Sequence, residues 1–136
     1  MESEVERIVR RATYASVVLG VVLSPIPLAD EIVLLPAYGV LAAKIGRANG
    51  VALSAMPWRP IALTALTGLG ARAAVNVTVS YIPFVAAAAN AASAVILTRI
   101  FGGYVDRVCR DPKTATPLGV RDFAAAMQPR KTPARA

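Results

Sequence analysis

The sequence predicts an all-α protein made of two helical hairpins with Pro corners, about four to five helices in all, followed by a disordered basic tail. Two similar segments support this: a Ser-x-Ile-Pro corner at residues 24–27 and another at 80–83, each between apolar stretches of helical pattern. Apolar residues make up 56% of the chain and charged residues 17%, against about 45–50% and about 25% in ordinary soluble domains. One stretch, 75–79, alternates like a strand, but its Ala-rich neighbours favour a helix.

The length of 136 residues indicates one domain with a single core. We expect a helical hairpin domain at residues 1–110 and a mostly disordered, basic, Pro-containing tail at 111–136. The chain has no histidine and a single cysteine, Cys109, so an internal disulfide and the commonest general base and metal ligand are excluded. No nucleophile and base are spaced for catalysis. We therefore expect no enzyme activity, no cofactor and no metal.

The first hairpin is expected to begin with one helix over residues 2–23. It is amphipathic at its start, where Glu6 and Arg10 are spaced to form an i,i+4 pair, and apolar all round at its end. After the first corner, a second helix should run from residue 27 or 28 to about 45, with Gly46 and Gly50 as end signals. Pro36 lies inside this helix and predicts a kink near residues 32–35.

The second hairpin follows a connection at residues 48–59. Ser54 is expected to cap a third helix that ends at residues 68–70, and a short helix over 71–80 should lead to the second corner. The last long helix is expected over 83–108, with Gly102 and Gly103 as a weak point near its end. Beyond it the chain is polar and rich in proline, with one turn of helix expected at 122–127.

The charges follow the same plan as the hairpins. Nearly all lie at the open ends, and only Asp30 and Glu31 lie near a corner. The uncharged runs 12–29 and 73–98 are divided by Pro25 and Pro83 into legs too short for a hydrocarbon core of about 30 Å. Folding at the corners also keeps every basic cluster on one side of a membrane, as the positive-inside tendency requires. The pattern favours a re-entrant insertion or a compact bundle over straight spans.

Candidate contact residues follow from this layout. At the corners, the residues expected to insert into a membrane or contact a partner are Pro25, Ile26, Pro27, Asp30, Glu31, Ile82 and Pro83. At the open ends, the residues expected to meet lipid headgroups or a partner are Lys44, Arg47, Arg59, Arg99, Arg107 and Arg110. For the two corner carboxylates the alternative is structural, because an acid in the first turn of a helix gains about 0.3–1 kcal/mol from the dipole.

Several other polar and aromatic residues are of the types that lie at the boundary between an apolar region and water. Arg72 and Arg99 are expected to snorkel at that boundary, and Trp58 and Tyr104 suit an interfacial position, with a core position as the alternative for Trp58. The basic tail could meet anionic lipid or remain solvated. Nucleic-acid binding is disfavoured, because Phe123 is the only aromatic residue after Tyr104.

Four segments together resemble the uncharacterised bacterial domain-of-unknown-function family 697. They are Leu23-Ser-Pro-Ile-Pro-Leu-Ala-Asp30, Ala43-Lys-Ile-Gly-Arg-Ala-Asn-Gly50, Tyr81-Ile-Pro83 and Leu97-Thr-Arg-Ile-Phe-Gly102, and the resemblance extends from about Ile8 to Arg110. It implies an all-helical, membrane-associated module often joined to small GTPase domains. The chain departs from the family in Asn49, where Tyr is usual, in Pro36-Ala37, where a polar residue is common, and in having no attached GTPase domain. A GTPase partner would therefore act in trans.

These observations predict a non-catalytic membrane-associated helical module that docks or anchors a partner at the cytoplasmic face of a bacterial inner membrane. Membrane lipid and a protein partner are the expected contacts, with homo-oligomerisation as a further possibility and no nucleic acid. One alternative is a soluble, cytoplasmic, oligomeric helical binding or scaffold protein. Another is an oligomeric membrane permeation or stress component.

Overall fold

The computed structural model of the protein describes residues 2–23, 29–79 and 83–127, and within this part every regular element is a helix. The α-helices are α1 (Glu4–Leu23), α2 (Ala29–Ala48), α3 (Trp58–Val79), α4 (Pro83–Arg110) and α5 (Val120–Met127). Two short 3-10 turns, η1 (Leu53–Ala55) and η2 (Pro112–Thr114), lie in the connections. The predicted all-α class is confirmed.

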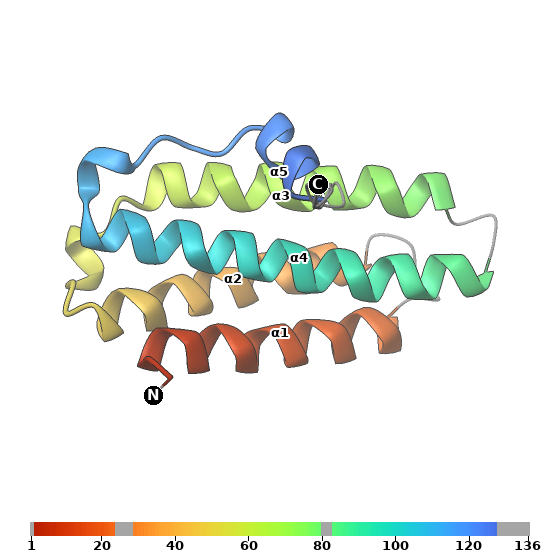
Figure 1. The fold of residues 1–136 in the computed structure, drawn as a ribbon, viewed down its shortest axis with the longest axis horizontal. Coiled ribbons are helices and arrows are strands. Elements are labelled where there is room, and N and C mark those ends of the chain that lie inside the picture. Colours follow the sequence, from red (N-terminus) through yellow and green to blue (C-terminus); the bar gives the residue numbers. More distant parts are fainter. Residues whose placement is uncertain (1, 24–28, 80–82, 128–136) are drawn as a thin grey trace, which may run out of the picture.

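The four long helices lie side by side and alternate in direction along the bundle (Figure 1). The pairs α1–α2 and α3–α4 each pack together, as expected for two hairpins, and α1 also packs extensively on α4. Helices α2 and α4 touch across the centre, whereas α1 and α3 make no contact within the described chain. The end of α1, the start of α2, the end of α3 and the start of α4 all lie at one end, here called the corner end. The opposite end is called the open end (Figure 1).

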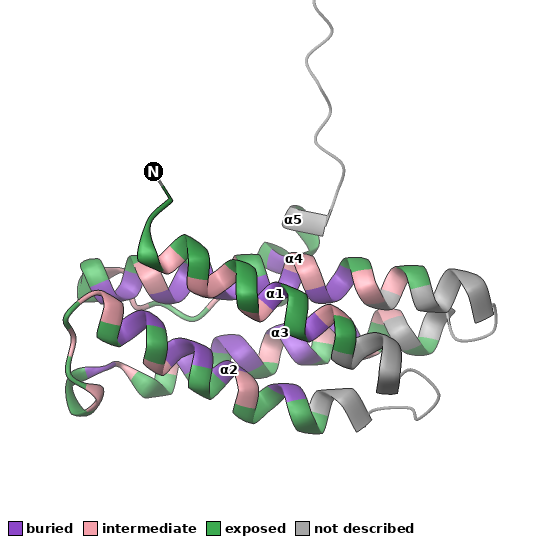
Figure 2. Ribbon diagram, turned by 90° about the horizontal axis from the view of Figure 1, so that it is seen from below, coloured by how far each residue is buried: buried purple, intermediate pink, exposed green. Residues whose placement is uncertain are grey.

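The core forms where the inner stripes of the helices meet. On α2 the buried residues recur three or four positions apart at 34, 38, 41 and 45, which places them on one face of a helix. The ring of Tyr38 packs against Phe101 of α4 with centroids 4.9 Å apart. Buried residues line the interior of all four long helices, and exposed residues cover the outside (Figure 2).

Three glycines allow close packing, and two of the predicted helix-end signals, Gly46 and residues 68–70, lie inside helices. Helix α3 continues through Gly68 and Gly70 as a single helix, and α4 continues through Gly102 and Gly103. A Cβ atom at Gly68 would clash with Leu97 Cδ1 and lie 2.9 Å from Phe123 Cζ, and one at Gly102 would lie 2.7 Å from Val9 Cγ2. Gly46, inside α2, packs against Met56 in the same way. The absence of a side chain at these positions serves packing and does not end a helix.

Helix α2 ends as Gly50 predicts, slightly later than expected. Gly50 has a φ of 72°, and the Val51 N–H donates to the Gly46 carbonyl oxygen at 2.9 Å, a typical glycine C-cap. Helix α2 also runs through Pro36 as one element. The expected Ser54 cap is wrong, because Ser54 lies inside η1 and α3 begins only at Trp58.

The start of α1 is a capping box and not the expected Glu6–Arg10 pair. The Glu6 N–H donates to Ser3 Oγ at 3.1 Å, and the Ser3 N–H donates to Glu6 Oε2 at 2.7 Å. Arg10 instead pairs with Glu2 at 2.9 Å. The carboxylate of Glu6 thus satisfies an N–H group at the helix start, and Arg10 reaches back two turns.

Part of the predicted disordered tail lies on the bundle. The expected helix at 122–127 is confirmed and begins earlier, at Val120. Phe123 of α5 is fully buried against α3 and α4, and the Leu118 N–H donates to Thr64 Oγ1 of α3 at 3.1 Å. The chain from 111 to 127 is therefore held on the bundle, while residues 128–136 are outside the described part.

Candidate functional site

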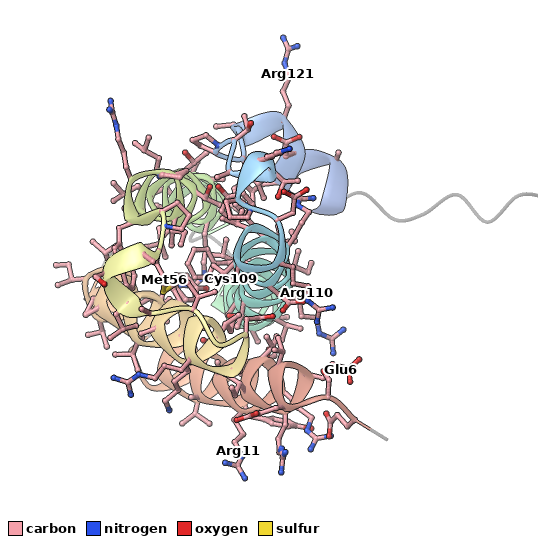
Figure 3. The ribbon with its side chains drawn as sticks, turned by 90° about the vertical axis from the view of Figure 1, so that its left-hand side faces the viewer. Glu6, Arg11, Met56, Cys109, Arg110 and Arg121 are labelled. Atoms are coloured by element: carbon pink, nitrogen blue, oxygen red, sulfur yellow. The ribbon has the colours of Figure 1, made fainter. Side chains whose placement is uncertain are left out.

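The basic candidate residues gather in the open half of the bundle. Lys44 and Arg47 are exposed on α2, Arg59 at the start of α3, and Arg99, Arg107 and Arg110 on α4. Figure 3 views the bundle from its open end and shows Arg110 and Glu6 on one side and Arg11 extending outward from α1 on another. Residues distant in the sequence thus form one charged end.

The corner candidates are only partly described. Pro25, Ile26, Pro27 and Ile82 lie outside the described residues. Asp30 and Glu31 fall in the first turn of α2, and Pro83 is the first residue of α4, but their side chains are not described. The helix bounds place all three at the corner end of the bundle (Figure 1).

The charges are segregated along the bundle axis. No charged residue occurs at positions 12–23 on α1, 32–43 on α2 or 83–98 on α4. These stretches have 12, 12 and 16 residues, so at 1.5 Å per residue the uncharged zone is about 18–24 Å deep. On α3 the one charged residue between positions 60 and 79 is Arg72, which is completely buried; the part of this helix beside the zone is its last 12 to 16 residues. Among the described side chains that α1–α4 contribute to this zone, none places a charge on the surface. Helix α5, whose Phe123 packs at Gly68 near the border with the open half, carries the exposed Arg121 and Asp122.

The surface of the uncharged zone carries exposed apolar side chains. Ile32 is 76% exposed and Val18 is 61% exposed, and Val33, Leu35 and Val77 are also exposed. Val40, Leu63 and Leu66 continue the apolar surface toward the middle of the bundle. Isolated exposed apolar residues are normal in proteins, but their concentration in a zone without surface charge indicates a contact surface.

A buried chain of hydroxyl groups joins three helices in the interior. Thr98 Oγ1 of α4 donates to Ser16 Oγ of α1 at 3.2 Å and lies 3.1 Å from the Tyr38 hydroxyl of α2. Burial raises the pKa of Tyr38, and the hydrogen bond with Thr98 and the charge of Arg72 oppose that rise. The chain satisfies polar groups where an apolar core would leave them unpaired, and it links α1, α2 and α4.

Arg72 corrects the expectation that it snorkels to a polar boundary. Its side chain is 0% exposed, and its Nε donates to Ser93 Oγ of α4 at 3.2 Å. Tyr104 also lies in the core and not at an interface, whereas Trp58 is 38% exposed and its indole N–H donates to the Leu53 carbonyl oxygen at 2.7 Å. Arg99 is exposed, in keeping with a boundary position.

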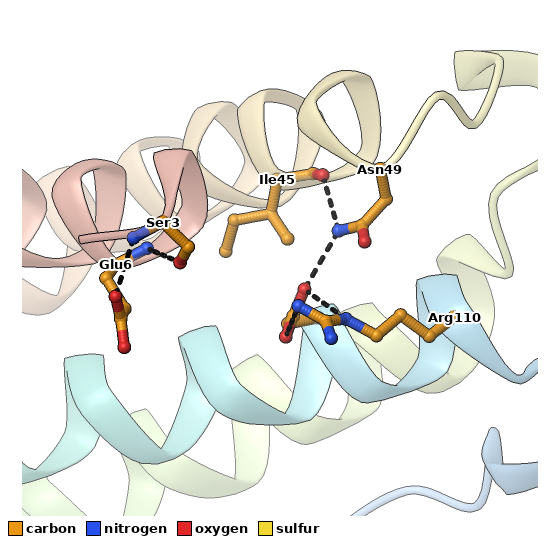
Figure 4. Close-up of polar contacts among 6 residues, drawn as sticks. Ser3, Glu6, Ile45, Asn49 and Arg110 are labelled. Atoms are coloured by element: carbon orange, nitrogen blue, oxygen red, sulfur yellow. Dashed lines mark hydrogen bonds and ion pairs between the residues drawn. The ribbon is translucent and has the colours of Figure 1, made fainter. Parts of the chain in front are cut away.

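A polar network closes the open end between α2 and α4. The Asn49 side-chain amide donates to the Ile45 carbonyl oxygen at 3.0 Å and to Asp106 Oδ1 at 2.9 Å, and Arg110 pairs with Asp106 at 3.1 Å (Figure 4). Cys109 lies buried nearby, and its pKa is raised by burial and by the negative charge of Asp106. A raised pKa favours the protonated thiol, which is the less reactive form.

Two open grooves flank α1. The α1–α4 groove, about 830 Å³, is bordered at the open end by an equal number of cations and carboxylates: Arg10, Arg99, Arg110, Glu2, Glu6 and Asp106. The α1–α2 groove, about 740 Å³, has three cations, Arg11, Lys44 and Arg47, and one carboxylate, Glu4. Only Lys44 and Arg47 were expected as contacts from the sequence. Arg11 was missed because it becomes their neighbour only when α1 and α2 pack antiparallel.

The described residues contain no group of three His, Cys, Asp or Glu side chains that could hold a metal ion. In the same part of the chain, no helix combines the length and hydropathy required to cross a membrane.

No protein-family model, curated protein or solved structure matches the chain. The resemblance to family 697 therefore stays a prediction from its sequence segments.

Proposed function

We propose that the protein is a non-catalytic helical module that inserts its corner end into one leaflet of a membrane and keeps its charged open end at the surface to dock a partner. The observation that carries this proposal is the axial segregation of charge: an uncharged zone with exposed apolar side chains at one end, and the exposed basic residues in the other half. The cytoplasmic face of a bacterial inner membrane is the location that the positive-inside tendency and the family resemblance favour.

The dimensions support insertion without crossing. The uncharged zone is about 18–24 Å deep, which is enough to fill one leaflet of a hydrocarbon core about 30 Å thick and too short to cross both leaflets. Full burial of a Val, Leu or Ile side chain contributes about 1.5–3 kcal/mol. Ile32, Val18 and Val77 are more than half exposed, so together with the partly exposed Val33 and Leu35 they provide several kcal/mol for partitioning into lipid.

The basic residues support the same orientation. Each Lys or Arg near an anionic membrane surface contributes about 1 kcal/mol of attraction. Arg59, Arg99 and Arg107 are exposed in the open half, so they would stand near the headgroups when the corner end enters the leaflet. Their side chains and the open-end face of the bundle remain accessible to a protein partner, for which the family resemblance suggests a small GTPase.

The test is vesicle flotation with substitutions that separate apolar insertion from charge attraction. Val18→Lys and Ile32→Lys each add a positive charge at an exposed site in the uncharged zone. If binding depends on apolar insertion, each variant binds phosphatidylcholine vesicles at least tenfold more weakly, because a charge must enter the hydrocarbon region. Val120→Lys is the matched control, since Val120 is also 61% exposed but lies on α5, next to the exposed charges of Arg121 and Asp122 and not on the surface of α1–α4.

The sign of the effect decides the outcome. Stronger binding of all three Lys variants to anionic vesicles would mean that charge attraction alone holds the protein at the surface, and insertion would be rejected. A wild-type chain that stays with the soluble fraction in flotation and after alkaline carbonate treatment would also reject it.

A second function is favoured by the apolar residues nearest the middle of the bundle. Leu63 and Leu66 are exposed on α3 and Val40 on α2, and a second copy of the chain could cover them in a soluble oligomeric scaffold. Light scattering after gel filtration without detergent tests this: a discrete dimer that Leu66→Lys converts to monomer would favour the scaffold over membrane insertion.

A further inference from the structure

Along its length, the α1–α2 groove changes from cationic to apolar side chains, which matches the anionic head and apolar chains of a phospholipid. Toward the open end it is bordered by Arg11, Lys44 and Arg47, and toward the corner end by the exposed apolar side chains of Ala15 and Val40. Its volume of about 740 Å³ is within the range of about 300–1,000 Å³ typical of small-molecule sites. A ligand that fills this groove needs an anionic head and an apolar remainder.

The charge balance distinguishes this groove from its neighbour. Three cations against Glu4 leave an excess of two positive charges, and no ion pair joins Arg11, Lys44 or Arg47 to an acidic side chain of the described chain. In the α1–α4 groove the cations and carboxylates are equal in number, and Arg10–Glu2 and Arg110–Asp106 are already paired. Among the described residues of the α1–α4 groove, Arg99 is the one cation outside these pairs, so the α1–α2 groove has more cations available for an external anion.

We infer that the α1–α2 groove binds one anionic phospholipid of the membrane that receives the corner end. The phosphate lies among Arg11, Lys44 and Arg47, where guanidinium groups can form paired hydrogen bonds with its oxygens. The acyl chains lie along Ala15 and Val40 within the uncharged zone. The head and tails of the bound lipid then have the same orientation as the lipids of the surrounding leaflet. This inference rests on the proposed function, because the lipid belongs to the membrane that receives the corner end. A free phosphate would leave the apolar part of the groove unfilled.

The experiment compares the binding of the full chain to vesicles of pure phosphatidylcholine and to vesicles containing 30% phosphatidylglycerol, about one lipid in three on the outer surface. The groove variant is Arg11→Gln with Lys44→Gln and Arg47→Gln. The control variant is Arg7→Gln with Lys113→Gln and Arg121→Gln, which removes the same charge from exposed residues outside the groove. Each cation contributes about fivefold to binding, so the affinity ratio of phosphatidylglycerol vesicles to phosphatidylcholine vesicles should fall on the order of 100-fold in the groove variant. In the control variant this ratio should fall only several-fold.

The outcomes separate this inference from the function on which it rests. Equal losses in the two variants would show diffuse charge attraction and overturn the lipid site, while binding to phosphatidylcholine would still support insertion. If millimolar inorganic phosphate abolishes the preference for phosphatidylglycerol vesicles, the groove is a general anion site and the lipid site is overturned. If the wild type does not bind phosphatidylcholine vesicles but its preference for phosphatidylglycerol still depends on the groove cations, insertion is rejected and the lipid site is supported. Native mass spectrometry in detergent should give one phosphatidylglycerol per chain for wild type and control, and none for the groove variant.

Discussion

At the scale of single residues, the glycines decide how closely the helices pack. Gly68 and Gly70 are two positions apart on the same helix, yet a side chain at Gly68 would meet Leu97 and Phe123, whereas one at Gly70 would meet nothing within 4 Å. The pattern recurs on α4, where Gly102 faces Val9 and Gly103 faces open space. One glycine of each pair is a packing requirement, and the other is replaceable.

The glycine pair on α3 provides a direct test. Gly68→Ala and Gly70→Ala gain the same helix propensity, about 1 kcal/mol, so their difference measures the clash. Overpacking a dense core costs about 1–3 kcal/mol. We expect Gly70→Ala to stabilise the protein and Gly68→Ala to be about 1–3 kcal/mol less stable than it, by urea unfolding monitored by circular dichroism. Equal stability of the two variants would mean that Leu97 and Phe123 move aside freely.

The buried thiol and phenol predict a loss of stability at alkaline pH. Burial raises the pKa of Cys109 above its ordinary value of 9.0 and that of Tyr38 above 10.0. Above pH 9 the unfolded chain releases the thiol proton while the folded chain retains it, so the free energy of unfolding falls as pH rises. For one group this slope reaches about 1.4 kcal/mol per pH unit, until the pH exceeds the raised pKa.

Urea unfolding at pH 7 to 10.5, under reducing conditions, checks this dependence. Cys109→Ser removes the titrating thiol and should shift the onset of the loss from about pH 9 to about pH 10, where Tyr38 takes over. An unchanged onset in the variant would show that the thiol has the same pKa in both states.

At the scale of elements, α5 is a short helix held by a single large side chain. Phe123 is fully buried between α3 and α4, and the segment before α5 is tied by the hydrogen bond from Leu118 to Thr64. Helices of eight residues are marginal on their own, so α5 depends on this docking.

Phe123→Ala should therefore release α5 while the four-helix bundle persists. Removing a buried Phe costs about 3–5 kcal/mol at most, and most of the loss should appear locally because the bundle has its own core. We expect hydrogen exchange in residues 115–127 to become at least tenfold faster, with little change in α1 and α2. Val120→Ala is the control, since Val120 is exposed. Protection in 115–127 that survives in Phe123→Ala would show that the Thr64 contact alone holds the segment.

The elements also show how far the sequence predicts this fold. The two hairpins, the start of α4 and the glycine end of α2 follow from apolar periodicity and from Pro and Gly signals that act locally. The division of α3 at residues 68–70 was wrong because the role of Gly68 depends on Leu97 and Phe123, which are distant in sequence. Arg72 was misplaced for the same reason, since its burial depends on Ser93 of the neighbouring helix.

The candidate surfaces were predictable to a different degree. The charge pattern along the chain is visible in the sequence, so the basic open end and the uncharged zone could be predicted once hairpins were assumed. The groove between α1 and α2 could not, because Arg11 and Lys44 are brought together only by the antiparallel packing of two helices. Local signals predict how charge is distributed along the chain better than which residues share a pocket.

At the scale of the whole molecule, most charged residues lie in the open half, and Asp30 and Glu31 are the two charged residues at the corner end. The interior of the bundle does not share this division. Arg72, Ser93 and the hydroxyls of Thr98 and Ser16 lie inside the uncharged zone or at its border, where the helices surround them. A protein that inserts one end into lipid must keep its polar groups satisfied internally, because lipid offers no hydrogen-bond partners. Polar groups inside and apolar groups outside are the arrangement expected for such an end.

Depth measurement on the whole molecule tests this arrangement. In a Cys109→Ser background, single cysteines at Val18, Ile32 and Val77 report on the uncharged zone, and cysteines at Arg47 and Arg107 report on the open half; the five native side chains are exposed, so labels there should not disturb the core. Labelled with an environment-sensitive fluorophore and mixed with vesicles, the first three should shift to the blue and resist an aqueous quencher, while the other two remain quenchable.

Because all three helices enter from the same side, quencher trapped inside the vesicles should reach none of the five labels. Quenching of Val18 or Val77 from inside would mean that a helix crosses the bilayer, and quenching of all five from outside would mean that the bundle rests on the membrane without entering it.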